Sequence, residues 1–224
     1  VAGMFGSAGL AFVGSLPIHT NFWDLCVRPE FQELFRTTSN RLVTESHKDF
    51  CANTAFRWDI YAAEPRVMQS PEERLKQIDD LYFRVARPDI SLPHQVNLGV
   101  VTSTIQGPLY ETLLKVLSKN SLRLSEILKD KSLKGNPAAD LIRAVDAGVA
   151  MGLFDVTAGP VKIAAKPAKG SVAVASPFNR AVLATDALGG RPVALASVAT
   201  GTGHTLGDFD AAILHELTSE GPDG

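Results

Sequence analysis

A glycine-rich stretch near the end of the chain is the clearest candidate for cofactor chemistry. Residues 198–207 read VATGTGHTLG and follow a predicted strand over 193–199. A Rossmann domain uses such a turn because glycine lets the backbone approach a nucleotide-containing cofactor. It then needs further strand–helix units and an acidic residue that holds the ribose hydroxyls. Only 17 residues follow Gly207, too few for even one more unit, so the pattern predicts a flexible β-turn here.

The other residue types that carry catalysis form no recognisable constellation. The sequence contains no GxxxxGK[ST] phosphate loop and no GxSxG nucleophile elbow, and its five histidines are scattered without an HxxxH or HExxH pair. Asp79 and Asp80 are adjacent, so on a helix they point about 100° apart and do not form a catalytic carboxylate pair. Cys26 and Cys51 each lie beside an apolar residue, which predicts small buried side chains. We therefore expect no catalytic, cofactor-binding or metal-binding residue in this chain.

The composition is that of an ordinary globular protein. The chain has 224 residues, is 45% apolar and 21% charged, and carries a formal net charge of −2. This balance gives no argument for binding to nucleic acid or to an anionic membrane. No stretch approaches the roughly 18–20 apolar residues that span a bilayer, so we expect no membrane insertion. Because the sequence starts without an initiator methionine, we expect a fragment of a longer protein.

Capping signals and apolar spacing predict the elements of the first part of the chain. Ser70, Pro71 and Glu73 form a capping box with proline at the first helical position, which predicts a helix over 70–82. Alternation of apolar and polar residues predicts strands that bury one face. The predicted elements are a helix tail and strand within 1–16, a helix from residue 29, a helix over 40–53 with Leu42, Val43, Ser46 and Phe50 on one face, a strand over 56–62 with Phe56, Trp58 and Ile60 inward, and a strand over 96–107.

The sequence changes character at Pro108, and we place a domain boundary between residues 107 and 108. Helices are predicted over 108–119, 125–129 and 137–152, and two strands over 153–156 and 161–164 then flank a turn. Three helices followed by a two-stranded wing is the order of a winged-helix domain. The predicted fold class is α+β and mainly helical, with an α+β domain over 1–107 and a winged-helix-like domain over 108–224. The second domain ends in a small helix–strand–helix extension, which follows an Ala-, Lys- and Val-rich connection over 164–175.

The winged-helix order raises the possibility of DNA binding. A recognition helix should bring Arg or Lys to phosphates and base edges. The corresponding helix over 137–152, capped by Asn136, carries Asp140, Arg143 and Asp146 and is otherwise apolar. This pattern is typical of a core or interface helix, and we expect no nucleic acid partner. A winged-helix transcriptional regulator remains the alternative function.

Residues 49–61 resemble the most distinctive motif of the predicted methyltransferase regulatory domain. In that family a helix ends in a pattern like Asp-Phe-x-x-Asn-x-x-Phe-Arg and an apolar strand follows. The residues that fall in register are Asp49, Phe50, Asn53, Phe56 and Arg57. Segments 9–14, 108–156, 175–180, 209–217 and 223–224 also look like parts of the family pattern, so the likeness extends over nearly the whole chain. The strand over 58–61 departs from it, because relatives usually carry a more basic, leucine-rich run there.

The resemblance implies a function that the isolated chain does not complete. In that family the region follows a class I S-adenosylmethionine-dependent methyltransferase domain. Relatives include bacterial protein-lysine methyltransferases that modify outer-membrane proteins, where the non-catalytic domains help to engage the substrate. We therefore expect a non-catalytic regulatory or substrate-recruiting module of a bacterial, cytoplasmic methyltransferase, with no activity of its own. Its expected partners are the catalytic domain, which would bind S-adenosylmethionine, and a protein substrate, and homo-oligomerisation stays open.

The motif residues also have a purely structural interpretation. Phe50 and Phe56 would bury their rings, which is worth about 1.5–3 kcal/mol each. Asn53 would cap the helix, and Arg57 would pair with Asp49 or bind the exposed carbonyls at the helix end. The functional alternative places Arg57 at an interface with the catalytic domain or with a protein substrate.

Overall fold

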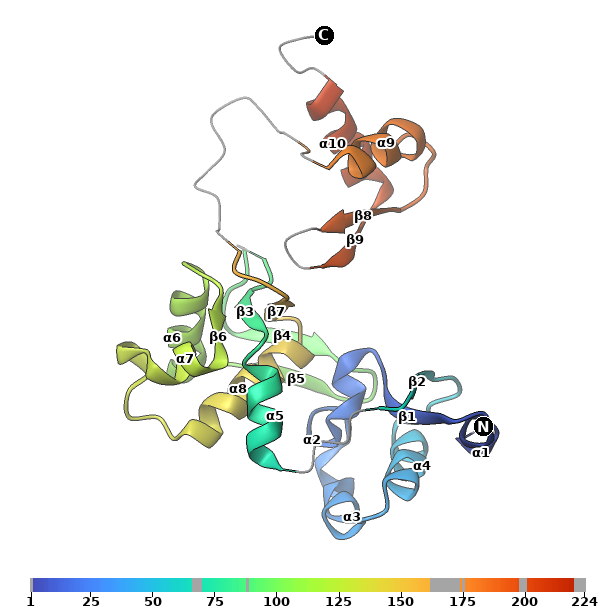
Figure 1. Ribbon diagram of the computed structural model, residues 1–224, viewed down its shortest axis with the longest axis vertical. Helices are drawn as coiled ribbons and strands as arrows, with labels where there is room; N and C mark the ends of the chain where they lie inside the picture. The colour runs from blue at the N-terminus through green and yellow to red at the C-terminus, as the bar shows by residue number, and fades with distance from the viewer. Residues whose placement is uncertain are drawn as a thin grey trace.

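The computed structural model describes residues 2–65, 70–87, 89–161, 174, 176–197 and 201–219. In these residues it is an α+β protein in which helices surround short antiparallel sheets (Figure 1). The helices are α1 (Ala2–Ser7), α2 (Trp23–Cys26), α3 (Gln32–Thr37), α4 (Arg41–Ala52), α5 (Pro71–Ile78), α6 (Pro108–Leu117), α7 (Leu124–Lys129), α8 (Ala138–Ala150), α9 (Pro177–Asp186) and α10 (Asp208–Ser219), with 3-10 turns at Ile18–Asn21, Pro29–Phe31 and Lys131–Leu133. The strands are β1 (Leu10–Leu16), β2 (Trp58–Ala63), β3 (Tyr82–Val85), β4 (His94–Asn97), β5 (Thr102–Ile105), β6 (Leu122–Arg123), β7 (Phe154–Thr157), β8 (Val193–Ser197) and β9 (Thr202–Leu206).

Residues 2–63, here called the ribbon region, combine a two-stranded sheet with four helices of one to three turns. β1 and β2 pair antiparallel into a ribbon, and α4 runs alongside it. α4 starts after Asn40, whose side-chain oxygen accepts hydrogen bonds from the N–H groups of Leu42 and Val43. It ends at Asn53, which takes the left-handed conformation (φ 50°, ψ 45°) that terminates many helices. The predictions of this helix and of the Asn53 cap are confirmed.

Residues 70–161, the central region, hold the largest core. β3 lies between β6 and β7 in a three-stranded sheet, and the helices α6, α7 and α8 pack around it. Leu113, Leu117, Ile127 and Phe154 are at most 2% exposed and form the middle of this core. Gly148 of α8 lies so close to the Phe154 ring that a methyl group there would overlap it, which explains a glycine inside a helix.

The central region confirms some predicted elements and corrects others. α6, α7 and α8 lie where they were predicted, and α8 buries one face, as expected of a core helix. The helix that starts after Ser70 ends at Ile78, and the residues that follow it form β3, which was not predicted. The predicted strand over 96–107 is a hairpin of β4 and β5, closed by a hydrogen bond from Leu98 N–H to the Val101 carbonyl. The residue preceding α8 is Pro137, one position after the predicted Asn136 cap.

The winged-helix arrangement is not confirmed. β7, the first strand of the predicted wing, pairs with β3. Most of the second predicted wing strand, residues 162–164, lies outside the described residues. The boundary between residues 107 and 108 stays a prediction, and the central core draws Phe83, Val85 and Ile105 from one side of it and α6–α8 from the other.

Residues 176–219, the C-terminal region, have a small core of their own. α9 and α10 cover a hairpin of β8 and β9, and Leu183, Ala187, Val193 and Ala211 are buried between them. α9 starts as predicted, with the Ser176 hydroxyl accepting a hydrogen bond from Asn179 N–H. This region is drawn in orange and red, away from the rest of the chain, in Figure 1. Apart from residue 174, the predicted connection over 164–175 lies outside the described residues, as do residues 223–224. Among the described helices, none has the length and apolar character to cross a bilayer.

Candidate functional site

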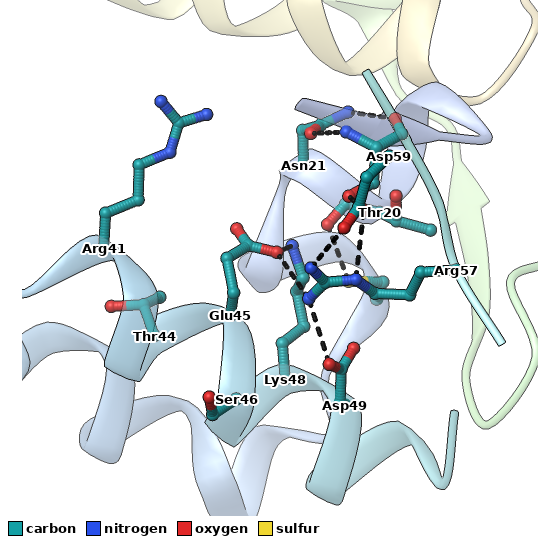
Figure 2. A network of polar contacts seen from close by, with 12 residues as sticks. Thr20, Asn21, Arg41, Thr44, Glu45, Ser46, Lys48, Asp49, Arg57 and Asp59 are labelled. Atoms are coloured by element: carbon teal, nitrogen blue, oxygen red, sulfur yellow. Dashed lines mark hydrogen bonds and ion pairs between the residues drawn. The ribbon is translucent and has the colours of Figure 1, made fainter. Parts of the chain in front are cut away.

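The family-like motif folds into an ion-pair network between α4 and the ribbon (Figure 2). Arg57 lies at its centre, with Nη1 donating to Asp49 Oδ2 at 3.0 Å and to Glu45 Oε2 at 3.3 Å. Nε and Nη2 donate to the two carboxylate oxygens of Asp59 at 3.1 and 2.7 Å. This fork-to-fork geometry uses the planar guanidinium in a way that a lysine cannot. The predicted pairing of Arg57 with Asp49 is therefore confirmed.

Lys48 adds a second cation to the same network. It is only 5% exposed, and its Nζ lies 2.7 Å from Glu45 Oε2. Two cations thus face three carboxylates, those of Glu45, Asp49 and Asp59. A charge this far from solvent is stable only when a partner compensates it, so removal of one member leaves the others uncompensated.

The first strand joins the network through polar contacts of Ser15. Its hydroxyl donates to Asp59 Oδ1 at 2.7 Å, and its backbone N–H and carbonyl pair with the Asn21 side-chain amide at 2.8 and 2.7 Å. The Asn21 amide thus occupies the place of a neighbouring strand. A β-carbon on Gly14 would lie 2.8 Å from Asn21 Oδ1, so only glycine leaves room for this contact.

The network shifts the pKa values of its members. Burial would lower the pKa of Arg57, but the hydrogen bonds and charges of Asp59 and Asp49 outweigh it, and the net pKa is raised. Burial would raise the pKa of Asp59, but hydrogen bonds from Arg57 and Ser15 and the nearby cations leave it lowered. Both groups are therefore held in their charged forms. The ion pairs of Arg57 with Glu45 and Asp49 join the ribbon to α4.

The two phenylalanines of the motif lie outside the network. Phe50 and Phe56 are each 91% exposed, so the expectation that they bury their rings is wrong. The helix and strand are joined by the charged residues of the motif, whereas its aromatic residues face solvent. Of the five motif residues, only Asp49 and Arg57 contact each other through side chains, and Asn53 acts through its backbone conformation.

The faces of β2 are the reverse of those expected. Alternation predicted that Trp58 and Ile60 face inward, yet they are 75% and 44% exposed, while Arg57 and Asp59 point toward α4. That expectation assumes that other residues of the same chain cover the apolar face of this strand. The available signal was on α4, where Glu45, Lys48 and Asp49 recur at i, i+3 and i+4 and place three charges on one face.

Opposite the network, the ribbon presents an apolar outer face, here defined as Leu16, Trp58 and Ile60. The pairing register sets Leu16 across from Trp58, so their side chains share this face. Leu16 and Phe56 also line a cavity of about 210 Å³, and Lys48, Asp49 and Arg57 of the network line the same cavity. The cavity continues to Leu98 at the end of β4, so it lies where the ribbon region meets the central region.

A second recess lies between α2 and α8. It has a volume of about 520 Å³, with Phe22, Leu25 and Ile142 among its apolar lining. Arg143 of α8 donates to Asp24 of α2 at 2.5 Å across it. Asp146 also lines the recess, and burial raises the pKa of its carboxyl, with the charge of Arg74 opposing.

The glycine-rich stretch over 198–207 forms no strand–turn–helix unit in its described part. Gly201 has a positive φ of 68°, and residues 202–206 form β9, antiparallel to β8. The expected turn is present, followed by a strand that was not predicted, while residues 198–200 lie outside the described residues. Cys26 is buried with a raised pKa, because burial disfavours its thiolate, and Cys51 is half-buried. Within the described residues, no three His, Cys, Asp or Glu side chains cluster so as to hold a metal ion.

Comparison with known proteins gives a family match for the ribbon region. Residues 1–63 match the family model described as the predicted methyltransferase regulatory domain. No curated protein matches the chain significantly.

Two solved structures are similar in fold over 98% of this chain. The structure of PKMT2 from Rickettsia typhi in complex with AdoHcy superposes with a TM-score of 0.55 at 14% identity, and a second structure of PKMT2 from Rickettsia typhi superposes with a TM-score of 0.51 at 14% identity. The chain spans 46% and 47% of the lengths of these proteins, so it corresponds to less than half of each.

The matched segment contains β1, α4 and β2, together with all five motif residues. The family model ends at residue 63, so the likeness to the family over the later segments stays a prediction. The resemblance predicted from Asp49–Arg57 is confirmed, because residues 1–63 match the model of the predicted methyltransferase regulatory domain.

Proposed function

We propose that this chain is a non-catalytic module of a bacterial S-adenosylmethionine-dependent protein methyltransferase, and that it regulates the catalytic domain or recruits its substrate. The observation that carries the proposal is the match of residues 1–63 to the predicted methyltransferase regulatory domain. The similarity in fold to a methyltransferase more than twice the length supports it, because the remaining half of such a protein has no counterpart here. Such a module would work in the cytoplasm beside its catalytic domain.

Cofactor binding is assigned to the catalytic domain outside this chain. The only glycine-rich loop of the sequence leads into β9, and a Rossmann cofactor site would need a helix there. The polar network around Arg57 is internally paired and offers no group for methyl transfer. The chain would therefore act on the reaction by positioning other groups.

Substrate recruitment would suit the recess between α2 and α8. Asp24, Asp140 and Asp146 line it with Arg143 and several apolar side chains, which complements a lysine-bearing protein segment. Because Arg143 already pairs with Asp24, Asp140 and Asp146 are the carboxylates left to meet an incoming cation. In methyl-transfer assays of the parent protein, Asp146→Asn would raise KM for a protein substrate without changing KM for S-adenosylmethionine. Equal changes in both would contradict this assignment.

DNA binding is the less supported function. α8, the helix in the recognition position, buries Leu141, Ala144, Val145, Gly148 and Ala150 in the central core. The side of α8 left uncovered carries Asp140, Asp146 and Arg143, and its net negative charge opposes contact with phosphates. We expect no mobility shift of mixed-sequence DNA at low salt.

Calorimetry with S-adenosylmethionine tests the proposed function. The isolated chain should give no binding heat, whereas the parent polypeptide, obtained from the reading frame that contains this chain, should bind it. Saturable binding of S-adenosylmethionine to the isolated chain would contradict the proposal, as would a parent polypeptide without a catalytic domain.

A further inference from the structure

The ribbon has two faces of opposite character, and only one is covered within the chain. Arg57, Asp59 and Ser15 project from the inner face and bond to α4 and to one another. The outer face of Leu16, Trp58 and Ile60 carries no charge, and its residues are 46%, 75% and 44% exposed. Tryptophan this exposed is unusual on a free surface, because its ring offers about 150–250 Å² of apolar area.

From this asymmetry we infer that the outer face of the ribbon is the docking surface for the catalytic domain of the same protein, with Trp58 as its main contact residue. The inference rests on the proposed function. It also assigns the contact with the partner to Trp58 in place of Arg57. Arg57 is 24% exposed and engaged in the inner network, so it holds the ribbon in position on the side away from the outer face.

Three observations select the catalytic domain as the occupant. The exposed face belongs to the segment that matches the regulatory domain model. The similar solved chains are more than twice as long, so a further domain accompanies this region there. The face lacks charged residues, which is typical of the centre of a lasting interface, while transient contacts with varied substrates have more polar surfaces.

The cavity beside the face gives the interface a definite shape. Leu16 belongs to the outer face and also lines the cavity, which reaches Leu98 of the central region. At about 210 Å³ the cavity is smaller than a typical ligand pocket. Because Lys48, Asp49 and Arg57 line it beside its apolar residues, it suits one side chain of the partner that has an apolar body and a polar end. Exposed Phe56 stands at its edge and would be covered by the same partner. Such a side chain in a pocket beside an aromatic residue is the usual form of an interface hot spot.

A binding experiment in trans tests the inference. The catalytic domain of the parent polypeptide is produced separately and titrated into this chain, which carries 5-fluorotryptophan and the Trp23→Phe substitution, so that Trp58 gives the single ¹⁹F signal. We expect the signal to shift on binding, and Trp58→Ser to weaken the affinity at least about tenfold. The matched control is Phe209→Ser in the C-terminal region, where Phe209 is 74% exposed, and it should leave the affinity unchanged.

The possible outcomes separate the two proposals. Binding with an unchanged Trp58 signal and an unaffected Trp58→Ser variant would overturn the docking face and leave the proposed function standing. Absence of any binding between the folded domains would contradict the proposed function and the docking face together. Circular dichroism of each variant shows whether it is folded, and Ile60→Ser provides a second test on the same face.

Discussion

The ribbon region and the central region differ in how far their apolar side chains are buried. Thirteen of the twenty large apolar side chains that are exposed among the described residues lie between residues 4 and 60, whereas two, Leu75 and Leu81, lie in the central region. The central region buries most of its apolar side chains in one core, around Leu113 and Phe154. The ribbon region has only a small core around Cys26, Val27 and Phe35. Ion pairs join its ribbon to α4, and many of its apolar side chains stay uncovered. The comparison indicates that the central region is a self-contained scaffold and that the ribbon region is built to meet another surface.

The largest expected effect lies in the central core. Phe154→Ala should lower the free energy of unfolding by about 3–5 kcal/mol, because it removes a ring that is 2% exposed and leaves a cavity between α8 and β7. Urea denaturation followed by circular dichroism measures the change. A loss below about 1 kcal/mol would show that this core is loosely packed and would remove the contrast with the ribbon region.

Disruption of the ion-pair network should lower the free energy of unfolding by a somewhat smaller amount. Arg57→Leu should cost about 2–3 kcal/mol, because Asp59 and Glu45 lose the guanidinium that compensates their charge. Arg57→Lys serves as the matched control and should cost less, since it keeps the charge and loses only the forked hydrogen bonds. If the two variants were equally unstable, geometry and not charge would hold the ribbon on α4.

Acid should weaken the ribbon region through Asp59. The pKa of Asp59 is lowered in the folded state, so its stabilising contribution is complete above the unfolded value near 3.9 and is lost as pH falls through the folded value. Asp59→Asn should therefore be destabilising at neutral pH, and its difference from the parent chain should shrink below about pH 4. Unfolding curves at several pH values measure this, with the exposed Asp80→Asn as a control that leaves the profile unchanged. A difference that is the same at pH 3 and pH 7 would contradict the role of Asp59.

The smallest expected effect concerns the outer face in the isolated chain. Trp58→Ser should change the free energy of unfolding by less than about 0.5 kcal/mol, because the side chain is 75% exposed and packs little within the chain. The same variant should weaken docking strongly, so stability and binding separate at this residue. A large loss of stability in the isolated chain would mean that Trp58 is a structural residue.

Local signals predicted much of the secondary structure. Ser70 and Ser176, each followed by proline, fixed the starts of α5 and α9, and the motif around Asn53 marked the end of α4. β3 was not predicted because it is four residues long and closely follows a helix. The alternation of apolar and polar residues is too short there to indicate a strand. β4 and β5 were merged because the alternation of Val96, Leu98 and Val100 runs through the turn between them.

The site was harder to predict than the fold. The spacing of the motif along the helix and the following strand predicted the pair Asp49–Arg57. Ser15 and Asn21 also belong to the network, but they lie more than 25 residues from this pair in the sequence, and the pairing of β1 with β2 brings them to it. The inward face of β2 was assigned wrongly because alternation shows two faces without showing which one the chain covers. A half-buried Arg57–Asp59 pair and an exposed Trp58 reverse the usual assignment.

Hydroxyl-radical footprinting of the outer face tests the central claim most directly. Oxidation rates of Trp58 are compared between the isolated chain and the parent polypeptide, with Phe209 as the internal reference. The account predicts rapid oxidation of Trp58 in the isolated chain and a several-fold slower rate in the parent, while the rate at Phe209 stays the same. Equal rates at Trp58 in both proteins would contradict the claim that this face docks the catalytic domain.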